Sequence, residues 1–181
     1  MIIFPKIIGL TGLAQSGKST ISNYLVANYG YKRVRFAEGL KNMLKVIGLT
    51  EAHVDGDQKE VPLKLFGGNT ARRAMQTLGT EWGRSLCQDI WVNIWEQAIL
   101  KYLENNENNK VVVDDVRFPN ELERVVKLGG KVIRVIRIGQ VSTSTHPSET
   151  ALNNIELPTI IAESGDMDKL YKGIDEIIGG R

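Results

Sequence analysis

The segment Gly12–Ser19 contains the residue types that bind a phosphate group. Gly12 and Gly17 enclose four residues, and Lys18 and Ser19 follow them, which gives the pattern G-x-x-x-x-G-K-S. Glycines at these positions let backbone N–H groups converge on a phosphate. The lysine adds positive charge for the β- and γ-phosphates, and the serine hydroxyl suits Mg²⁺. The pattern therefore predicts binding of a nucleotide phosphate, and a glycine-rich turn without such a role is the alternative.

Two carboxylates, Asp114 and Asp115, follow the apolar run Val111–Val113. In a phosphate-loop protein the end of such a strand lies beside the phosphates, where a carboxylate can hold Mg²⁺ or its water ligands. We expect Ser19 and Asp114 to serve the metal, although the sequence leaves open which of the two carboxylates takes this role. The alternative is a turn whose aspartates bond to the nearby backbone.

Arg117 lies two residues further on, and Pro119 begins the next predicted helix. A guanidinium at this edge of the sheet would bind a phosphate through two parallel hydrogen bonds. The alternative is a surface ion pair between Arg117 and Glu121.

Arg72 and Arg73 lie near the start of a helix predicted over Thr70–Leu78. Adjacent arginines are often only solvated, but in a protein that holds a second phosphorylated substrate they are candidates for binding it. Gly79 is expected to end this helix and to leave backbone groups free near Thr80.

Several other side chains have both a functional and a structural interpretation. Lys41 lies on a predicted helix where phosphate-loop kinases bind the acceptor, and a solvated lysine is the alternative. Trp91 is a candidate for a pocket edge, whereas Trp95 is expected in the core. His146 precedes a proline and is expected to be structural rather than catalytic. Cys87 lacks the neighbours of a metal ligand or nucleophile.

Composition places the 181 residues in one ordinary globular domain. Apolar residues make up 42% and charged residues 24%, the net charge is +2, and there is one cysteine. These values argue against a nucleic-acid surface and exclude an internal disulfide framework. No stretch approaches the roughly 20 apolar residues of a membrane span. Because cleavage of a signal peptide would remove the first strand, we expect a cytoplasmic protein.

Strands and helices are predicted to alternate, which indicates an α/β fold with a mostly parallel central sheet and helices on both faces. One polar segment, Thr50–Asn69, interrupts this alternation and is either a mobile segment over the site or a disordered linker. Predicted strands are Ile2–Leu10, Tyr31–Phe36, Lys110–Asp114, Lys131–Ile138 and Thr159–Ala162, and the principal predicted helices are Lys18–Asn28, Leu40–Ile47, Thr70–Leu78, Ile90–Leu103 and Met167–Ile178.

Over nearly its whole length the chain resembles the phage deoxynucleoside monophosphate kinases of the adenylate-kinase-like class. The resemblance implies a P-loop NTPase three-layer fold, a single domain over 1–181 and a helical acceptor-binding region at about 37–105. The segments that carry it are Gly12–Thr20, Phe36–Lys41, Arg72–Thr80, Trp91–Val92, Asp115–Glu121 and Ile138–His146.

The resemblance also implies transfer of the ATP γ-phosphoryl group to a deoxynucleoside monophosphate, with Mg²⁺. Ala14 stands where some relatives carry a basic residue. The residues implied to bind ATP are Gly12, Ser16, Gly17, Lys18, Ser19, Thr20 and Thr145. Those implied to contact the acceptor are Ala14, Leu40, Lys41, Arg72, Arg73, Gly79, Thr80, Trp91, Asp115, Arg117 and Glu121. The expected catalytic residues are Lys18, Arg72, Arg73, Arg117 and Asp115.

Two alternatives remain at this point. The opening Gly9–Gly12 with Ser16–Thr20 is also similar to dephospho-CoA kinase. A nucleotide switch would carry N-K-x-D, which Asn109–Val112 lacks, whereas Asp114 and Asp115 keep a P-loop ATPase open. We expect nucleotides as the only partners, with neither nucleic acid nor membrane. A homodimer is left open, and for a phage protein the compartment is the host cytoplasm.

Overall fold

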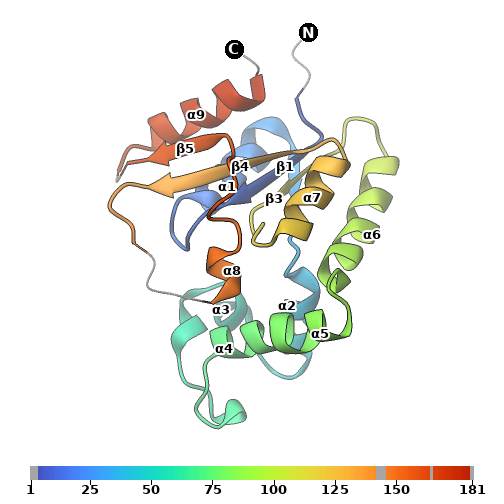
Figure 1. Ribbon diagram of the computed structural model, residues 1–181, viewed down its shortest axis with the longest axis vertical. Helices are drawn as coiled ribbons and strands as arrows, with labels where there is room; N and C mark the ends of the chain where they lie inside the picture. Colours follow the sequence, from blue (N-terminus) through green and yellow to red (C-terminus); the bar gives the residue numbers. More distant parts are fainter. Residues whose placement is uncertain (1–3, 142–145, 164, 180–181) are drawn as a thin grey trace. The chain divides into compact units, whose positions relative to one another are not determined.

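The computed structural model describes residues 4–141, 146–163 and 165–179. Within these ranges five strands form one parallel sheet in the order β2-β3-β1-β4-β5 (Figure 1). The predicted parallel α/β fold is confirmed, although the first two strands are shorter than expected. The strands are β1 Ile7–Thr11, β2 Tyr31–Arg33, β3 Lys110–Val113, β4 Lys131–Arg137 and β5 Thr159–Ala162.

Helices cover both faces of the sheet. On one face, α1 (Lys18–Tyr29) and α9 (Met167–Gly179) enclose a core of buried aliphatic side chains from the central strands. On the other face, α7 (Pro119–Lys127) approaches β1 closely at Gly9, where an added Cβ would lie 3.1 Å from side-chain atoms of Val116 and Val132. Strands β1 and β3 are therefore almost wholly apolar, as expected for strands buried on both faces.

A carboxylate fastens α9 to α1. Asp175 accepts hydrogen bonds from the hydroxyls of Tyr24 and Tyr29, at 2.9 and 2.7 Å, and the ring of Tyr24 stacks on that of Tyr171. These contacts hold α1, the helix that follows the phosphate loop, on the face of the sheet.

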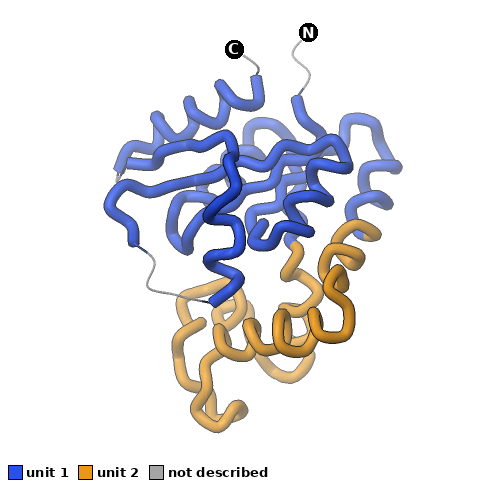
Figure 2. The backbone as a smooth tube through the Cα atoms, viewed as in Figure 1, with its two compact units in different colours: residues 1–35, 98–181 blue, residues 36–97 orange. Residues whose placement is uncertain are grey.

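Residues 36–97 form a second compact unit, separate from the unit that contains the sheet (Figure 2). Its core consists of Leu40, Leu44, Leu49, Val54, Ala71 and Trp91. This helical unit lies within the region 37–105 expected to bind the acceptor, and that role stays a prediction. Its elements are α2 Glu38–Val46, α3 Glu51–Val54, η1 Asp57–Glu60, η2 Lys64–Phe66, α4 Ala71–Gln76, η3 Thr77–Gly83, α5 Arg84–Leu86 and the first part of α6 Ile90–Glu104.

The segment Thr50–Asn69 is folded, which corrects the expectation of a mobile segment or a disordered linker. It contains α3 and two short 3₁₀ helices, and Val54 is fully buried. Leu63 and Phe66 pack against the same core. These few apolar residues anchor a segment that is otherwise polar.

Gly79 does not end its helix, which corrects a second expectation. The chain continues through Thr77–Gly83 as a π-helical segment. The carbonyl of Gly79 accepts a hydrogen bond of 2.7 Å from the indole N–H of Trp91, and a Cβ on Gly79 would lie 3.3 Å from Leu40. The glycine is therefore explained by close packing inside the helical unit rather than by a helix end.

The remaining described helix, α8 (Pro147–Thr150), follows β4. None of the helices in the described ranges has the length and apolar character needed to cross a membrane.

Gly83 provides a test of this packing. An added Cβ would lie only 2.6 Å from the ring of Trp91, so we expect Gly83→Ala to destabilise the protein by about 1–3 kcal/mol. Gly179, at the end of α9, has open space around it, so Gly179→Ala should be neutral or slightly stabilising. Urea unfolding of both variants measures the difference. Equal midpoints for Gly83→Ala and the wild type would contradict the packing described.

Candidate functional site

The loop between β1 and α1 adopts a backbone that requires glycine at two positions. Gly12 has φ +138° and Gly17 has φ +111°, in the region that residues with a side chain rarely adopt. A Cβ on Gly12 would also lie 2.2 Å from the carbonyl oxygen of Val135. The loop leads directly into α1 at Lys18, so unpaired N–H groups and the positive end of the helix dipole meet there. This geometry suits an anion.

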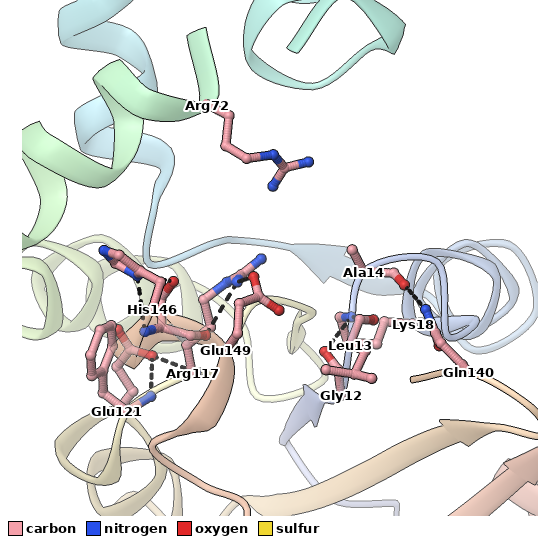
Figure 3. Close-up of polar contacts among 12 residues, drawn as sticks. Gly12, Leu13, Ala14, Lys18, Arg72, Arg117, Glu121, Gln140, His146 and Glu149 are labelled. Carbon is pink, nitrogen blue, oxygen red and sulfur yellow. Dashed lines mark hydrogen bonds and ion pairs between the residues drawn. The ribbon is translucent and has the colours of Figure 1, made fainter. Parts of the chain in front are cut away.

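Lys18 is held beneath the loop without an anionic hydrogen-bond partner. Its ammonium group donates to the carbonyl oxygens of Gly12 and Leu13 at 2.7 and 2.6 Å (Figure 3). Burial lowers the pKa of Lys18 from 10.5 to about 8, and the positive charge of Arg117 acts in the same direction. Acidic residues nearby oppose this shift only in part. A bound phosphate would therefore compensate a charge that the free protein leaves poorly balanced.

Side chains from beyond β4 support the phosphate loop. The amide of Gln140 donates to the carbonyl of Ala14 (Figure 3), and Arg137 donates to that of Gln15 at 3.4 Å. Inside the loop, the hydroxyl of Ser16 is buried and has no hydrogen-bond partner among the described residues. A buried polar group of this kind gains a partner when a ligand supplies one.

A cavity of about 430 Å³ borders the loop within the unit that contains the sheet. Its volume falls in the range of small-molecule sites. Arg134, one of its lining residues, donates to the backbone carbonyls of Leu152 and Ile155 at 2.6 and 2.9 Å and so anchors the segment after α8. Other residues that line the cavity include Gly12, Leu13, Arg117, Arg137 and Glu149.

Arg117 pairs with Glu149 rather than with Glu121. Its guanidinium donates to the Glu149 carboxylate at 2.5 Å and to the carbonyl of Ser148 at 3.3 Å (Figure 3). Glu121 is buried, and its carboxylate accepts from the backbone N–H groups of Arg117 and Phe118 at 2.7 and 3.1 Å. The expected ion pair of Arg117 with Glu121 is therefore wrong. Glu121 holds the first turn of α7, and its contact with a substrate stays a prediction.

The two carboxylates after β3 lie in different surroundings. Asp114 is buried beside two arginines, with Nε of Arg35 at 2.9 Å from Oδ1 and Nε of Arg33 at 3.3 Å from Oδ2. Asp115 is partly exposed. Within the described ranges no group of three or more His, Cys, Asp or Glu residues could hold a metal ion. The metal role expected for Asp114 thus competes with two guanidinium groups.

In the helical unit, two residues expected to contact the acceptor are buried. Lys41 is 8% exposed and pairs with Asp55 at 2.7 Å. Trp91 is 3% exposed and is bonded to Gly79. Both side chains therefore stabilise the helical unit, and contact of either with a ligand stays a prediction.

The other candidate residues of this unit are more accessible. Arg72 on α4 pairs with Glu60, and Arg73 pairs with Glu81 at 3.1 Å. Leu40 packs in the core, and Thr80 is partly exposed on the π-helical segment.

Ser19 and Thr20 lie in the first turn of α1, where Ser19 is exposed. Thr145 falls outside the described residues.

Sequence reasoning missed Glu149, Arg33, Arg35 and Asp55. Each forms an ion pair with a residue of interest, but the two partners are between 14 and 81 positions apart in the chain. No local pattern reports a contact of this kind. A weak signal was available for Glu149 alone, because it follows His146 and Pro147 at the start of a predicted turn near the site.

Known proteins similar to this chain share one description. Residues 58–174 match the family model described as deoxynucleotide monophosphate kinase. A protein of Acanthamoeba polyphaga mimivirus, provisionally named deoxynucleotide monophosphate kinase, is 32% identical over 180 residues, with 93% of each chain covered. The deoxynucleotide monophosphate kinase of Escherichia phage RB69 is 32% identical over 108 residues. That match covers 59% of this chain and 44% of the phage protein.

Two solved structures share the fold. One, from Chloroflexus aurantiacus J-10-fl and provisionally described as a kinase, has a TM-score of 0.51 at 14% identity and covers 98% of this chain and 97% of its own. The other, TT1252 from Thermus thermophilus, has a TM-score of 0.53 at 17% identity and covers 98% of each chain. At these identities the likeness supports the fold alone.

The lowered pKa of Lys18 predicts a specific pH dependence of stability. Between pH 8 and 10.5 the unfolded chain holds a proton on Lys18 that the folded chain has lost, so the wild type gains stability as pH rises in this window. Lys18→Met removes this gain. The unfolding free energy of the variant relative to the wild type should fall from pH 8 to 9.5, by at most about 1 kcal/mol per pH unit. Denaturant titrations measure it, and a constant difference would contradict the shift.

Proposed function

The chain belongs to the deoxynucleotide monophosphate kinase family, and we propose that it transfers the γ-phosphoryl group of ATP to the 5′-phosphate of a deoxynucleoside monophosphate. The products are ADP and a deoxynucleoside diphosphate. The observation that carries this proposal is the phosphate loop, in which Lys18 is buried with a lowered pKa and only carbonyl oxygens accept its hydrogen bonds.

An acceptor phosphate is already a nucleophile at neutral pH, so the reaction needs no strong general base. The chain's contribution is to position the reacting groups in line and to neutralise charge on the transferred phosphoryl group. We propose that Lys18 leaves the carbonyls of Gly12 and Leu13 and donates to the β- and γ-phosphates of ATP. The loop N–H groups and the Ser16 hydroxyl would bind the same phosphates.

Mg²⁺, when bound, neutralises charge on the phosphates of ATP. The Ser19 hydroxyl fits it, since it is exposed in the first turn of α1 at the end of the phosphate loop. Asp114 does not fit it well, because its carboxylate is already paired with two arginines.

Arg117, together with Arg72 and Arg73 on α4, is proposed to bind the acceptor phosphate. Arg117 would exchange the Glu149 carboxylate for a phosphate oxygen, and Arg72 would exchange that of Glu60. Each exchange replaces one charge-assisted hydrogen bond with another, so the free protein keeps both guanidinium groups charged and oriented. Asp115 and Thr80 are proposed to contact the acceptor, and Thr145 the ATP. The substrates are cytoplasmic nucleotides, and we propose that the enzyme works in the cytoplasm.

An assay of ADP formation over a panel of acceptors tests the proposed reaction. Deoxynucleoside monophosphates should stimulate ADP release, with stoichiometric deoxynucleoside diphosphate detected by ³¹P NMR. Stimulation by dephospho-CoA alone would indicate the related kinase instead. Release of inorganic phosphate without any acceptor would indicate an ATPase.

The assignment of the arginines predicts a separation of two affinities. Arg117→Ala and Arg72→Ala should each lower kcat/KM for the deoxynucleotide by about 10²- to 10³-fold, because a positioned donor to the transferred group is lost. The affinity for ATP, measured by isothermal titration, should change much less. Lys127→Ala, an exposed residue of α7, is the control and should change neither value. If only ATP affinity fell in the arginine variants, their proposed role would be reversed.

A further inference from the structure

Arg33 joins the end of β3 to the first turns of α1. Its Nε donates to the hydroxyl of Ser22 at 2.6 Å, and its Nη2 donates to the carbonyl of Ser19 at 3.3 Å and to the side-chain oxygen of Asn23 at 2.5 Å. Because the Nε hydrogen is donated to Ser22, the 3.3 Å approach to Asp114 Oδ2 is a charge–charge contact. One guanidinium therefore contacts three residues of α1 and one carboxylate.

This network is buried at its centre. Ser22 is fully buried and the side chain of Asp114 is 3% exposed, while that of Arg33 is 25% exposed. Arg35 adds a second positive charge at 2.9 Å from the other Asp114 oxygen. In such surroundings an ion pair gains strength, and an uncompensated charge becomes costly.

We propose that Asp114 is a positioning residue and not a metal ligand: through Arg33 it fixes the first turn of α1, and with it the phosphate-binding groups Lys18 and Ser19. This inference rests on the proposed nucleotide-binding function of the loop. It assigns to Asp114 and Arg33 a role in preparing the site before any ligand arrives.

Charge balance separates the two roles. A carboxylate that ligates Mg²⁺ directs its charge to the cation, and here that would leave Arg33 and Arg35 beside a carboxylate already engaged by a divalent ion. Three positive centres would then share one buried negative charge. With Asp114 paired to the arginines, no such conflict arises, and Ser19 and the nucleotide remain to bind the metal.

The geometry also explains why the network would affect nucleotide binding. The carbonyl of Ser19 that Arg33 contacts belongs to the residue whose hydroxyl suits the metal, and Lys18 immediately precedes it. A guanidinium that loses Asp114 is no longer held at the end of β3. The first turn of α1 then loses the support that orients both side chains.

The test measures binding of a non-hydrolysable ATP analogue by isothermal titration, once with EDTA and once with Mg²⁺. Asp114→Asn and Arg33→Met should each weaken binding by about tenfold under both conditions, so that the ratio of the two affinities stays at the wild-type value. The double variant should be little weaker than either single variant. Arg33→Lys should restore part of the affinity. Lys32→Met, at the exposed neighbouring position of β2, is the matched control and should bind like the wild type.

A metal ligand behaves differently in each arm. If Asp114 binds Mg²⁺, Asp114→Asn keeps the EDTA affinity and loses the enhancement by Mg²⁺. Arg33→Met would then free the carboxylate and strengthen binding with Mg²⁺, which is opposite in sign to our expectation and decides the question even if Asp114→Asn fails to fold. Variants that lose stability but bind normally under both conditions would also overturn the proposal. A wild type that binds no analogue at all would instead refute the proposed function.

Discussion

An incompletely compensated positive charge at the phosphate loop is the constraint on which the site depends. Lys18 is held by two backbone carbonyls, and burial together with Arg117 lowers its pKa to about 8. Such a group is costly in the free protein and favourable once an anion arrives. The surrounding fold keeps the charge in place, because β1 delivers the loop to the edge of the sheet and α1 begins at the lysine itself.

Other charged residues near the loop are already paired in the free protein. Arg117 pairs with Glu149, while Arg33 and Arg35 pair with Asp114. Carboxylates of this kind have two distinct uses in our account. Glu149 occupies a guanidinium that a phosphate would later take, whereas Asp114 stays with its arginines and supports the helix. The difference follows from surroundings, since Glu149 lines a cavity and Asp114 is buried against α1.

The parallel sheet and the phosphate loop could be predicted because their signals are local. Apolar runs such as Val111–Val113 indicate buried strands, and the glycine spacing around Lys18 reports a backbone that only glycine adopts readily. The π-helical segment could not be predicted, because Gly79 is typical of a helix end unless the contact with Trp91 is known. For the same reason the folded state of Thr50–Asn69 was missed, since a few buried residues such as Val54 outweigh a polar composition. Ion pairs such as that of Arg117 with Glu149 join distant positions and leave no pattern in the sequence.

The central claim is that the ammonium of Lys18 awaits an anion, and its titration tests this most directly. With ¹³C-labelled lysine, the Cε resonance of Lys18, assigned by its absence in Lys18→Met, can be followed by NMR from pH 6.5 to 10.5 with and without the ATP analogue. We predict a pKa near 8 in the free protein and a clearly higher value in the complex. An ordinary value near 10.5 in the free protein, or a pKa that the nucleotide leaves unchanged, would contradict the account.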